Sequence, residues 1–246
     1  MSSSARSHPT LARAVRKWWQ DGIAQHGFWP TLHKFIGELG GFLLESTPEC
    51  RRQRYGDVEY DWEYRVDTTS ATVSFRNRLL GIFHSPYQAT EAALFHEMVS
   101  GLQIDYQQFT FLDLGSGKGR TLLMASDYPF RRIVGVELLP ELHCVAEENI
   151  RNYRSERQKC FRIEAICADA REFILPKEPA VVYLFNPFTE SLFKEVVANL
   201  EHTMREGRQP VYVLYHNPLL ERVLAQSSLL RKVGGTHQYV VYRSAE

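Results

Sequence analysis

The chain has 246 residues, 44% of them hydrophobic, which suits one α/β domain of ordinary size with an appendage and excludes two large independent domains. Lysine plus arginine and aspartate plus glutamate number 29 each. Because the chain has no net charge, long-range electrostatic attraction to nucleic acid or anionic lipid is not expected. The four cysteines lack Cys-x-x-Cys spacing and the nine histidines lack metal-binding spacing, which favours reduced thiols, a cytoplasmic location and no metal site.

The N-terminal part of the chain predicts two amphipathic helices. Apolar residues recur at helical spacings over 10–26 and again over 28–44, with a break near Gly27. Residues 1–20 are basic and serine-rich, so a transit peptide is an alternative to the favoured disordered start and surface helix. Trp18 and Trp19 lie on the apolar face of the first helix, and we expect this face to pack on the main domain rather than to anchor at a membrane. No run approaches the roughly 20 apolar residues of a membrane helix, so we expect a soluble protein without a membrane partner.

Residues 46–78 mix charged and aromatic side chains. This mixture suits a lid or a peptide-contacting surface, and an irregular segment packed on the core is an equal alternative. We therefore expect residues 1–85 to form a helical and lid-like region and residues 86–246 to form the main domain. A helix is predicted over 91–102, with Thr90 as its N-cap.

The most informative stretch is 109–120, where an alternating apolar run stops at three glycines spaced two apart. It predicts a strand, a tight turn and the start of a helix. Gly115 and Gly117 can adopt positive φ and have no side chain, so a ligand with polar acceptors can reach the amides of the turn. The spacing does not match a phosphate loop or a dinucleotide fingerprint, and Asp113 stands two residues before the first glycine.

Strands and helices alternate from residue 109 onward, which predicts a mostly parallel sheet covered on both faces. The second strand ends at Glu137, 24 residues after Asp113, and the third reaches Asp169 and Ala170. The fourth strand is followed by Asn186, Pro187 and Phe188, and the fifth covers 210–215 before a terminal hairpin over 229–242. The intervening helices are expected at about 119–127, 139–154, 189–206 and 217–227.

These strand ends resemble the motifs of the class I, Rossmann-like methyltransferases, in which an Asp-x-Gly-x-Gly turn follows the first strand. The resemblance implies a doubly wound, mostly parallel seven-stranded sheet with an antiparallel last strand, and S-adenosylmethionine as cofactor. It implies that Glu137 accepts hydrogen bonds from the ribose hydroxyls and that Asp169 and Ala170 border the adenine. The cofactor-binding candidates are then Tyr87, Thr90, Asp113, Gly115, Ser116, Gly117, Glu137, Asp169, Ala170 and Asn186.

Asn186, Pro187 and Phe188 resemble the Asn/Asp-Pro-Pro-Tyr/Phe motif of enzymes that methylate amino groups, without the second proline. They are the catalytic candidates: Asn186 would orient the attacking nitrogen and Phe188 would shape its slot, near Tyr215 and His216. The missing proline disfavours nucleobases and glutamine amides. A turn that merely starts the next helix is the alternative for Asn186.

Together with Tyr87 to Thr90, motif I and Glu137, this element is also similar to the non-SET class of histone lysine methyltransferases, named for disruption of telomeric silencing. The expected partner is therefore a protein lysine. A small-molecule amine methyltransferase and a silent S-adenosylmethionine-binding module are the alternatives. An NAD-dependent oxidoreductase is disfavoured by the glycine spacing.

Overall fold

The computed structural model describes residues 16, 19–20, 23–24, 26–45, 58–69, 89–185, 188–207 and 209–245. The chain divides into two compact units. The smaller comprises Met1–Tyr55 and Ala71–Tyr87, and the larger comprises Gly56–Ser70 and Gln88–Glu246. The expected division at residue 85 differs from this one because Gly56–Ser70 clusters with the larger unit.

The smaller unit contains helix α2, Phe28–Glu45. Gly27 precedes it with φ +83°, a left-handed conformation that glycine adopts without a steric penalty. The Thr31 hydroxyl donates to the Gly27 carbonyl at 2.7 Å, and the Trp19 ring meets the rings of Phe28 and Phe35 edge to face. The predicted helix after Gly27 is thus confirmed, and the described residues before it are also helical.

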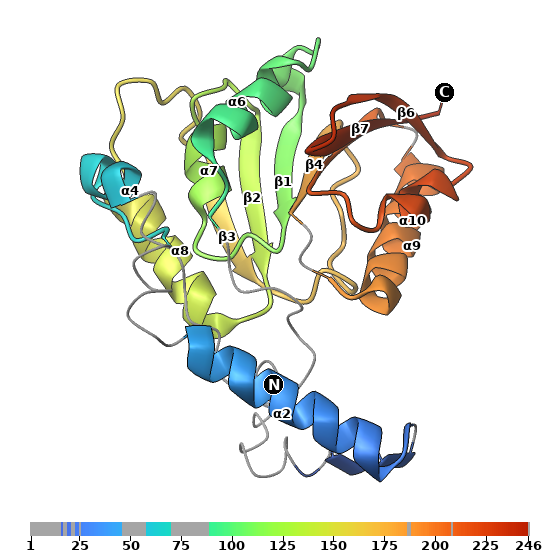
Figure 1. Cartoon of the computed structure of the whole chain (residues 1–246). Coiled ribbons are helices and arrows are strands. Elements are labelled where there is room, and N and C mark those ends of the chain that lie inside the picture. Colours follow the sequence, from blue (N-terminus) through green and yellow to red (C-terminus); the bar gives the residue numbers. More distant parts are fainter. Residues whose placement is uncertain are drawn as a thin grey trace, which may run out of the picture. The chain divides into compact units, whose positions relative to one another are not determined.

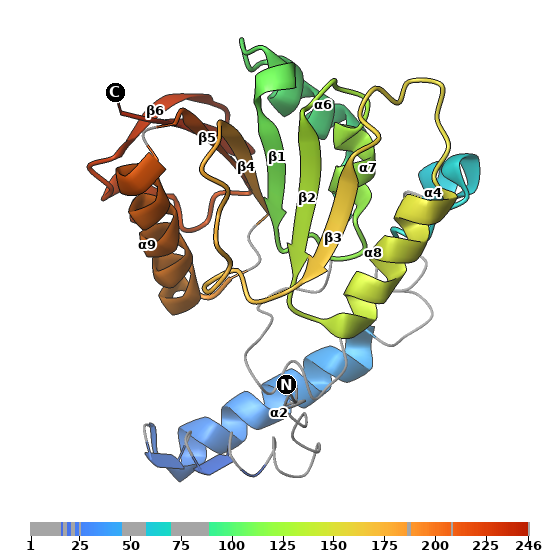
Figure 2. The same cartoon turned by 180° about the vertical axis from the view of Figure 1, so that it is seen from behind.

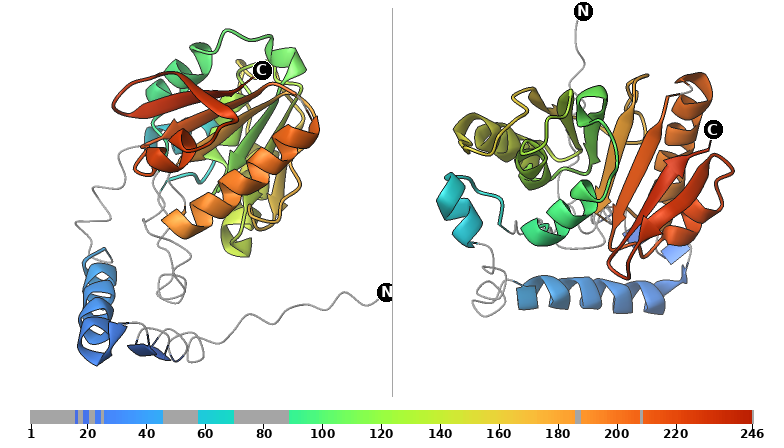
Figure 3. Two further views of the ribbon diagram at one scale, coloured as in Figure 1. Left: turned by 90° about the vertical axis from the view of Figure 1, so that its right-hand side faces the viewer. Right: turned by 90° about the horizontal axis from the view of Figure 1, so that it is seen from above.

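The larger unit is built on a seven-stranded sheet of order β3-β2-β1-β4-β5-β7-β6 (Figures 1 and 2). Strands β1 to β5 are parallel, and β7 is antiparallel to both of its neighbours, β5 and β6. The hairpin of β6 and β7 lies at one edge of the sheet (Figure 3). The strands are β1 Thr110–Leu114, β2 Arg132–Glu137, β3 Ile163–Cys167, β4 Ala180–Phe185, β5 Val211–His216, β6 Leu230–Gly235 and β7 Tyr239–Ser244. This is the Rossmann-like sheet with an antiparallel last strand that the sequence predicted.

Helices cover both faces of this sheet. On one face α9 and α10 pack against side chains such as Leu112, and on the other α6 and α7 pack against side chains such as Phe111. Consecutive strand residues point to opposite faces, so each central strand supplies both cores and reads as a continuous apolar run. The helices are α4 Val58–Tyr64, α6 Ala92–Ser100, α7 Arg120–Ala125, α8 Pro140–Asn152, α9 Glu190–Gly207 and α10 Glu221–Ala225, with a 3₁₀ turn η1 at Tyr106–Gln108.

Two details of the expected secondary structure were wrong. Helix α6 is capped by Glu91, without a side-chain hydrogen bond, because the Thr90 hydroxyl lies against the Tyr183 hydroxyl at 3.2 Å instead. Helix α10 begins only at Glu221, since a turn with Asn217 at φ +49° precedes it. Within the described residues, no helix is long and apolar enough to cross a membrane.

Candidate functional site

The glycine turn between β1 and α7 has the backbone that the sequence predicted. Gly115, Gly117 and Gly119 have φ values of +96°, +53° and +83°, and Gly119 is the N-cap of α7. The amides of Gly115 and Ser116 donate to the carbonyl of Val136 at 2.8 and 3.1 Å. The turn is therefore anchored to the end of the neighbouring strand β2.

Two positions outside the Gly115–Gly117 motif make room for this turn. A Cβ on Gly135 of β2 would lie 2.6 Å from Leu122 Cδ1 and 2.7 Å from Ser116 Oγ. A Cβ on Gly119 would lie 3.1 Å from the Cβ of Ala146 in α8. Ser116 is 4% exposed, and its Oγ has no hydrogen-bond partner among the described residues, although a buried hydroxyl ordinarily has one. The Ser116 hydroxyl of the turn is therefore available to form a hydrogen bond with a ligand.

The acid before the turn, Asp113, is buried in the wall of the site. It is 2% exposed, and its Oδ2 accepts a hydrogen bond from the Thr121 hydroxyl of α7. Burial raises the pKa of Asp113 to about 7, and the nearby Glu137 carboxylate acts in the same direction. Asp113 joins β1 to α7 and places a titratable carboxyl beneath the turn.

Glu137, at the end of β2, connects directly to the turn. Its Oε2 accepts the Gly117 amide at 2.9 Å, and its Oε1 accepts the Leu139 amide at 2.8 Å. The residue is 3% exposed; burial raises the pKa of its carboxyl, and the backbone hydrogen bonds oppose this shift. Each carboxylate oxygen can accept more than one hydrogen bond, so Glu137 retains acceptor capacity for two hydroxyl groups.

The residues after β3 are held by an ion pair. Arg171 donates through Nε to both carboxylate oxygens of Asp169 at 3.0 Å and through Nη2 at 2.5 Å. These hydrogen bonds lower the pKa of Asp169. The neighbouring Ala170 is 7% exposed and belongs to the core beneath α9. Asp169 is therefore fixed at this strand end, with part of its acceptor capacity already occupied by Arg171.

A buried polar chain lies beside the ends of β4 and β5. The Tyr183 hydroxyl contacts His216 Nδ1 at 2.9 Å and the Thr90 hydroxyl at 3.2 Å, and the Phe185 ring stacks on the His216 ring at 3.9 Å. Burial lowers the pKa of His216 to about 4, so the imidazole is neutral at pH 7. Sequence reasoning identified Thr90 and His216 separately and missed Tyr183, which connects them.

One expected pairing was wrong. Tyr215 and His216 cannot line the same slot, because successive strand residues face opposite sides of the sheet. Tyr215 packs on Phe193 of α9 at a ring distance of 5.1 Å, whereas His216 stacks on Phe185, which packs on the core beneath α6 and α7. Phe188 packs at 6.4 Å on Phe193, on the same side as Tyr215. The candidates Tyr87, Asn186 and Pro187 lie outside the described residues.

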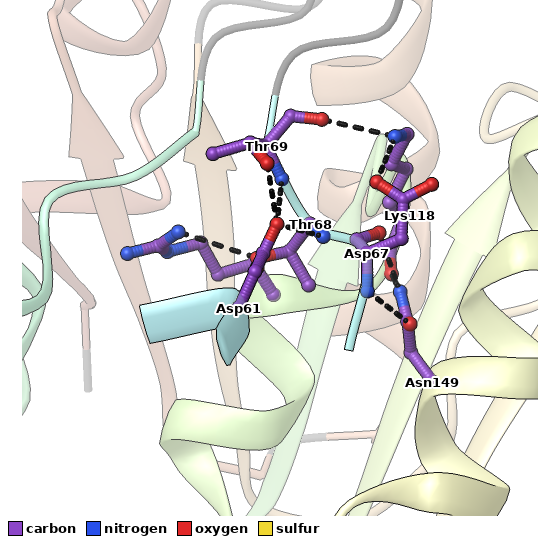
Figure 4. Close-up of polar contacts among 7 residues, drawn as sticks. Asp61, Asp67, Thr68, Thr69, Lys118 and Asn149 are labelled. Atoms are coloured by element: carbon purple, nitrogen blue, oxygen red, sulfur yellow. Dashed lines mark hydrogen bonds and ion pairs between the residues drawn. The ribbon is translucent and has the colours of Figure 1, made fainter. Parts of the chain in front are cut away.

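Residues 58–69 contact the turn from outside; they belong to the stretch 46–78 that was expected to be a lid or a segment packed on the core, but sequence reasoning did not identify which of their side chains make the contact. Lys118 of the turn directs its ammonium to Asp67 Oδ1 at 2.5 Å and to the Thr69 carbonyl at 2.9 Å (Figure 4). Asn149 of α8 donates to the backbone carbonyls of both Asp67 and Lys118. No periodic signal marks such a contact, since Asp67 and Lys118 are 51 residues apart.

No protein family model and no curated protein matches the chain. Solved structures with a similar fold include an RNA methyltransferase from Salinibacter ruber in complex with S-adenosyl-L-homocysteine (22% identity, TM-score 0.44, 63% of this chain and 91% of that one). A predicted N6-adenine-specific DNA methylase from Listeria monocytogenes has 14% identity and a TM-score of 0.47; the match covers 63% of this chain and about half, 51%, of that protein. A ribosomal protein L11 methylase from Lactobacillus delbrueckii has 15% identity and a TM-score of 0.42, with 63% of this chain and 76% of that one covered. At these identities the likeness is one of fold alone.

Proposed function

We propose that this protein is a methyltransferase that uses S-adenosylmethionine and methylates an amino-type nitrogen. The observation that carries the proposal is the joined geometry of the glycine turn and Glu137. Three glycines at positive φ open the turn backbone, and the Gly117 amide is bonded to a buried carboxylate at the end of the next strand. In open parallel sheets a ligand binds beyond the carboxyl ends of the strands, where this pair lies.

The residues present fit this cofactor. Glu137 would hold the ribose hydroxyls, Ser116 Oγ would supply a hydrogen bond, and the carboxyls of Asp113 and Glu137 favour a ligand that carries an ammonium and a sulfonium. A phosphate group would meet two buried acids here, and Lys118 is already engaged by Asp67. The same arrangement disfavours a nicotinamide dinucleotide.

When bound, the cofactor would supply an electrophilic methyl group to a neutral amine, with S-adenosyl-L-homocysteine as the leaving group and the amine proton released to solvent. The chain has then to align the amine with the methyl group and exclude water. Asn186 would orient the nitrogen, and His216, neutral and stacked on Phe185, would place no charge at that end of β4 and β5. A protein lysine is the proposed acceptor, supported by the Asn-Pro-Phe motif, and a small-molecule amine is the alternative.

Calorimetric titration with S-adenosyl-L-homocysteine tests cofactor binding, with NADH as the competing ligand. Binding of S-adenosyl-L-homocysteine alone is expected. Binding of NADH alone would overturn the proposal. Incubation with methyl-labelled S-adenosylmethionine and separated protein, RNA and metabolite fractions then identifies the acceptor. Label on protein lysine is expected, and cofactor binding without transfer to any fraction would indicate a silent binding module.

A further inference from the structure

Residues 58–69 form a compact unit that ends against the glycine turn. Helix α4 stops at Arg65, which has φ +54°, and Asp61 folds the following residues back. The Asp61 carboxylate accepts the amides of Thr68 and Thr69 at 2.8 and 2.7 Å, and both hydroxyls as well (Figure 4). This turn presents Asp67 and the Thr69 carbonyl on one side.

A closed ring of hydrogen bonds connects this segment to Lys118. Asn149 Oδ1 accepts the Asp67 amide at 2.8 Å, and Asn149 Nδ2 donates to the carbonyls of Asp67 and Lys118 at 2.8 and 2.9 Å. The Lys118 ammonium closes the ring on the Asp67 carboxylate. Asn149 is 2% exposed, so its own hydrogen bonds lie away from bulk water, whereas the Asp67 carboxylate at the other end of the ring is 65% exposed. We call Asp67, Lys118 and Asn149 the latch.

Arg120 strengthens the connection at the first residue of α7. Its Nη1 donates to the Thr68 hydroxyl at 3.2 Å, and its guanidinium lies 4.1 Å from the centre of the Tyr60 ring. Arg120 is 2% exposed and Thr68 is fully buried. Both ends of the junction between the turn and α7 are therefore attached to residues 58–69.

We propose that the latch is a positioning element of the cofactor site, which holds the glycine turn in its ligand-binding conformation. This inference rests on the proposed function. Lys118 follows Gly117, whose amide bonds to Glu137, so a displacement of Lys118 moves the amide that places this carboxylate. The latch acts through the turn, and none of its three side chains needs to touch the cofactor.

Asp67 is the better position for a test substitution because it is the exposed partner of the ion pair, whereas Lys118 is buried. The Asp67 side chain is 65% exposed, so Asp67→Asn leaves the fold intact. The Lys118 side chain is 8% exposed, and without the carboxylate its charge is poorly compensated. Lys118 then favours a more solvated position, and the turn shifts with it. Lys118→Gln, which removes the charge and keeps a donor, provides a second variant.

The experiment compares the wild type, Asp67→Asn and Lys118→Gln by calorimetry with S-adenosyl-L-homocysteine and by hydrogen exchange of residues 115–119 without ligand. Glu206→Gln is the matched control, since it removes a carboxylate that pairs with Lys177 at 2.8 Å on the far helix α9. We expect affinity to fall roughly tenfold in both latch variants, exchange in the turn to quicken, and the control to match the wild type. By linkage, S-adenosyl-L-homocysteine should slow exchange over 58–69 in the wild type.

The outcomes separate this inference from the proposed function. Wild-type affinity and unchanged turn exchange in both latch variants would overturn the latch as a positioning element. Lower affinity together with uniformly faster exchange across the larger unit would also overturn it, because the latch would then act on global stability. If the wild type does not bind S-adenosyl-L-homocysteine, the proposed function fails, and exchange in the turn still decides whether the latch holds it.

Discussion

Asp113 and His216 give the stability of the fold opposite dependences on pH. Asp113 is 2% exposed, and burial raises its pKa from 3.8 to about 7. His216 is 8% exposed, and burial lowers its pKa from 6.5 to about 4. Folding therefore favours the neutral form of each group, and the two groups reach neutrality at opposite ends of the same pH range.

The direction of each effect follows from the protons bound in the folded and unfolded chains. Between about pH 4 and 7 the folded chain retains the Asp113 proton that the unfolded chain has lost, so the stability from Asp113 is complete below pH 3.8 and is lost as pH rises through about 7. The unfolded chain protonates His216 below pH 6.5, so the stability from His216 is complete above 6.5 and is lost as pH falls to about 4. At roughly 1.36 kcal/mol per pKa unit, these effects are on the order of 4 and 3 kcal/mol.

Single substitutions separate the two effects. Asp113→Asn retains an oxygen that can accept the Thr121 hydroxyl, and His216→Gln retains an amide near Tyr183. Urea unfolding between pH 4 and 8 gives the free energy of unfolding of each protein. Relative to the wild type, the stability of Asp113→Asn should rise with pH, because this variant lacks the stability that Asp113 loses as pH rises, and the stability of His216→Gln should fall with pH, because this variant lacks the stability that His216 gains. Parallel pH profiles in the two variants would refute the reasoning, because other titrating groups are common to both.

Three further substitutions test the proposed site. Glu137→Gln leaves one acceptor oxygen for the amides of Gly117 and Leu139 and turns an NH2 donor toward the other amide, so it should cost on the order of 2 kcal/mol of S-adenosyl-L-homocysteine affinity, roughly 30-fold by calorimetry; unchanged affinity would remove Glu137 from the site. Gly135→Ala places a Cβ 2.7 Å from Ser116 Oγ and should weaken binding at least about tenfold while urea unfolding stays cooperative; wild-type affinity would show that the turn tolerates the displacement. Asn186→Ala should preserve cofactor affinity and slow methyl transfer roughly 100-fold in the labelling assay, and a native rate would make Asn186 a turn residue.

The sheet and the glycine turn could be predicted because their signals are local. Asp113 and Glu137 each end a short apolar run, and parallel strands bring their carboxyl ends to one edge of the sheet. The positive φ of Gly117 follows from the same stretch of sequence. The order of the strands in the sheet could be anticipated only from the resemblance to a family, because apolar runs predict strands but not which strands are neighbours.

The contacts of the site with distant residues could not be predicted. Lys118 and Asp67 meet because residues 58–69 fold back on Asp61, and nothing in the sequence pairs the lysine of the glycine turn with this aspartate. The separation of Tyr215 from His216 was a different failure, since strand alternation was sufficient to place them on opposite faces. The two residues were expected in one slot because they are adjacent in the sequence, although adjacent strand residues point in opposite directions.

The direction of Lys118 connects the choice of ligand to the latch. A lysine within a glycine turn is the group that would bring positive charge to a phosphate, but here its ammonium is held by Asp67 and by the Thr69 carbonyl. The next cation, Arg120, bonds to Thr68 of the same segment. The carboxyls of Asp113 and Glu137 remain buried beside the turn, and the acceptor oxygens of Glu137 suit a ligand with hydroxyl groups better than a phosphate, which offers acceptors of its own. The ion pair that fastens the turn thus also compensates the positive charge next to it, and loss of Asp67 would alter both the position of the turn and its preference for ligand charge.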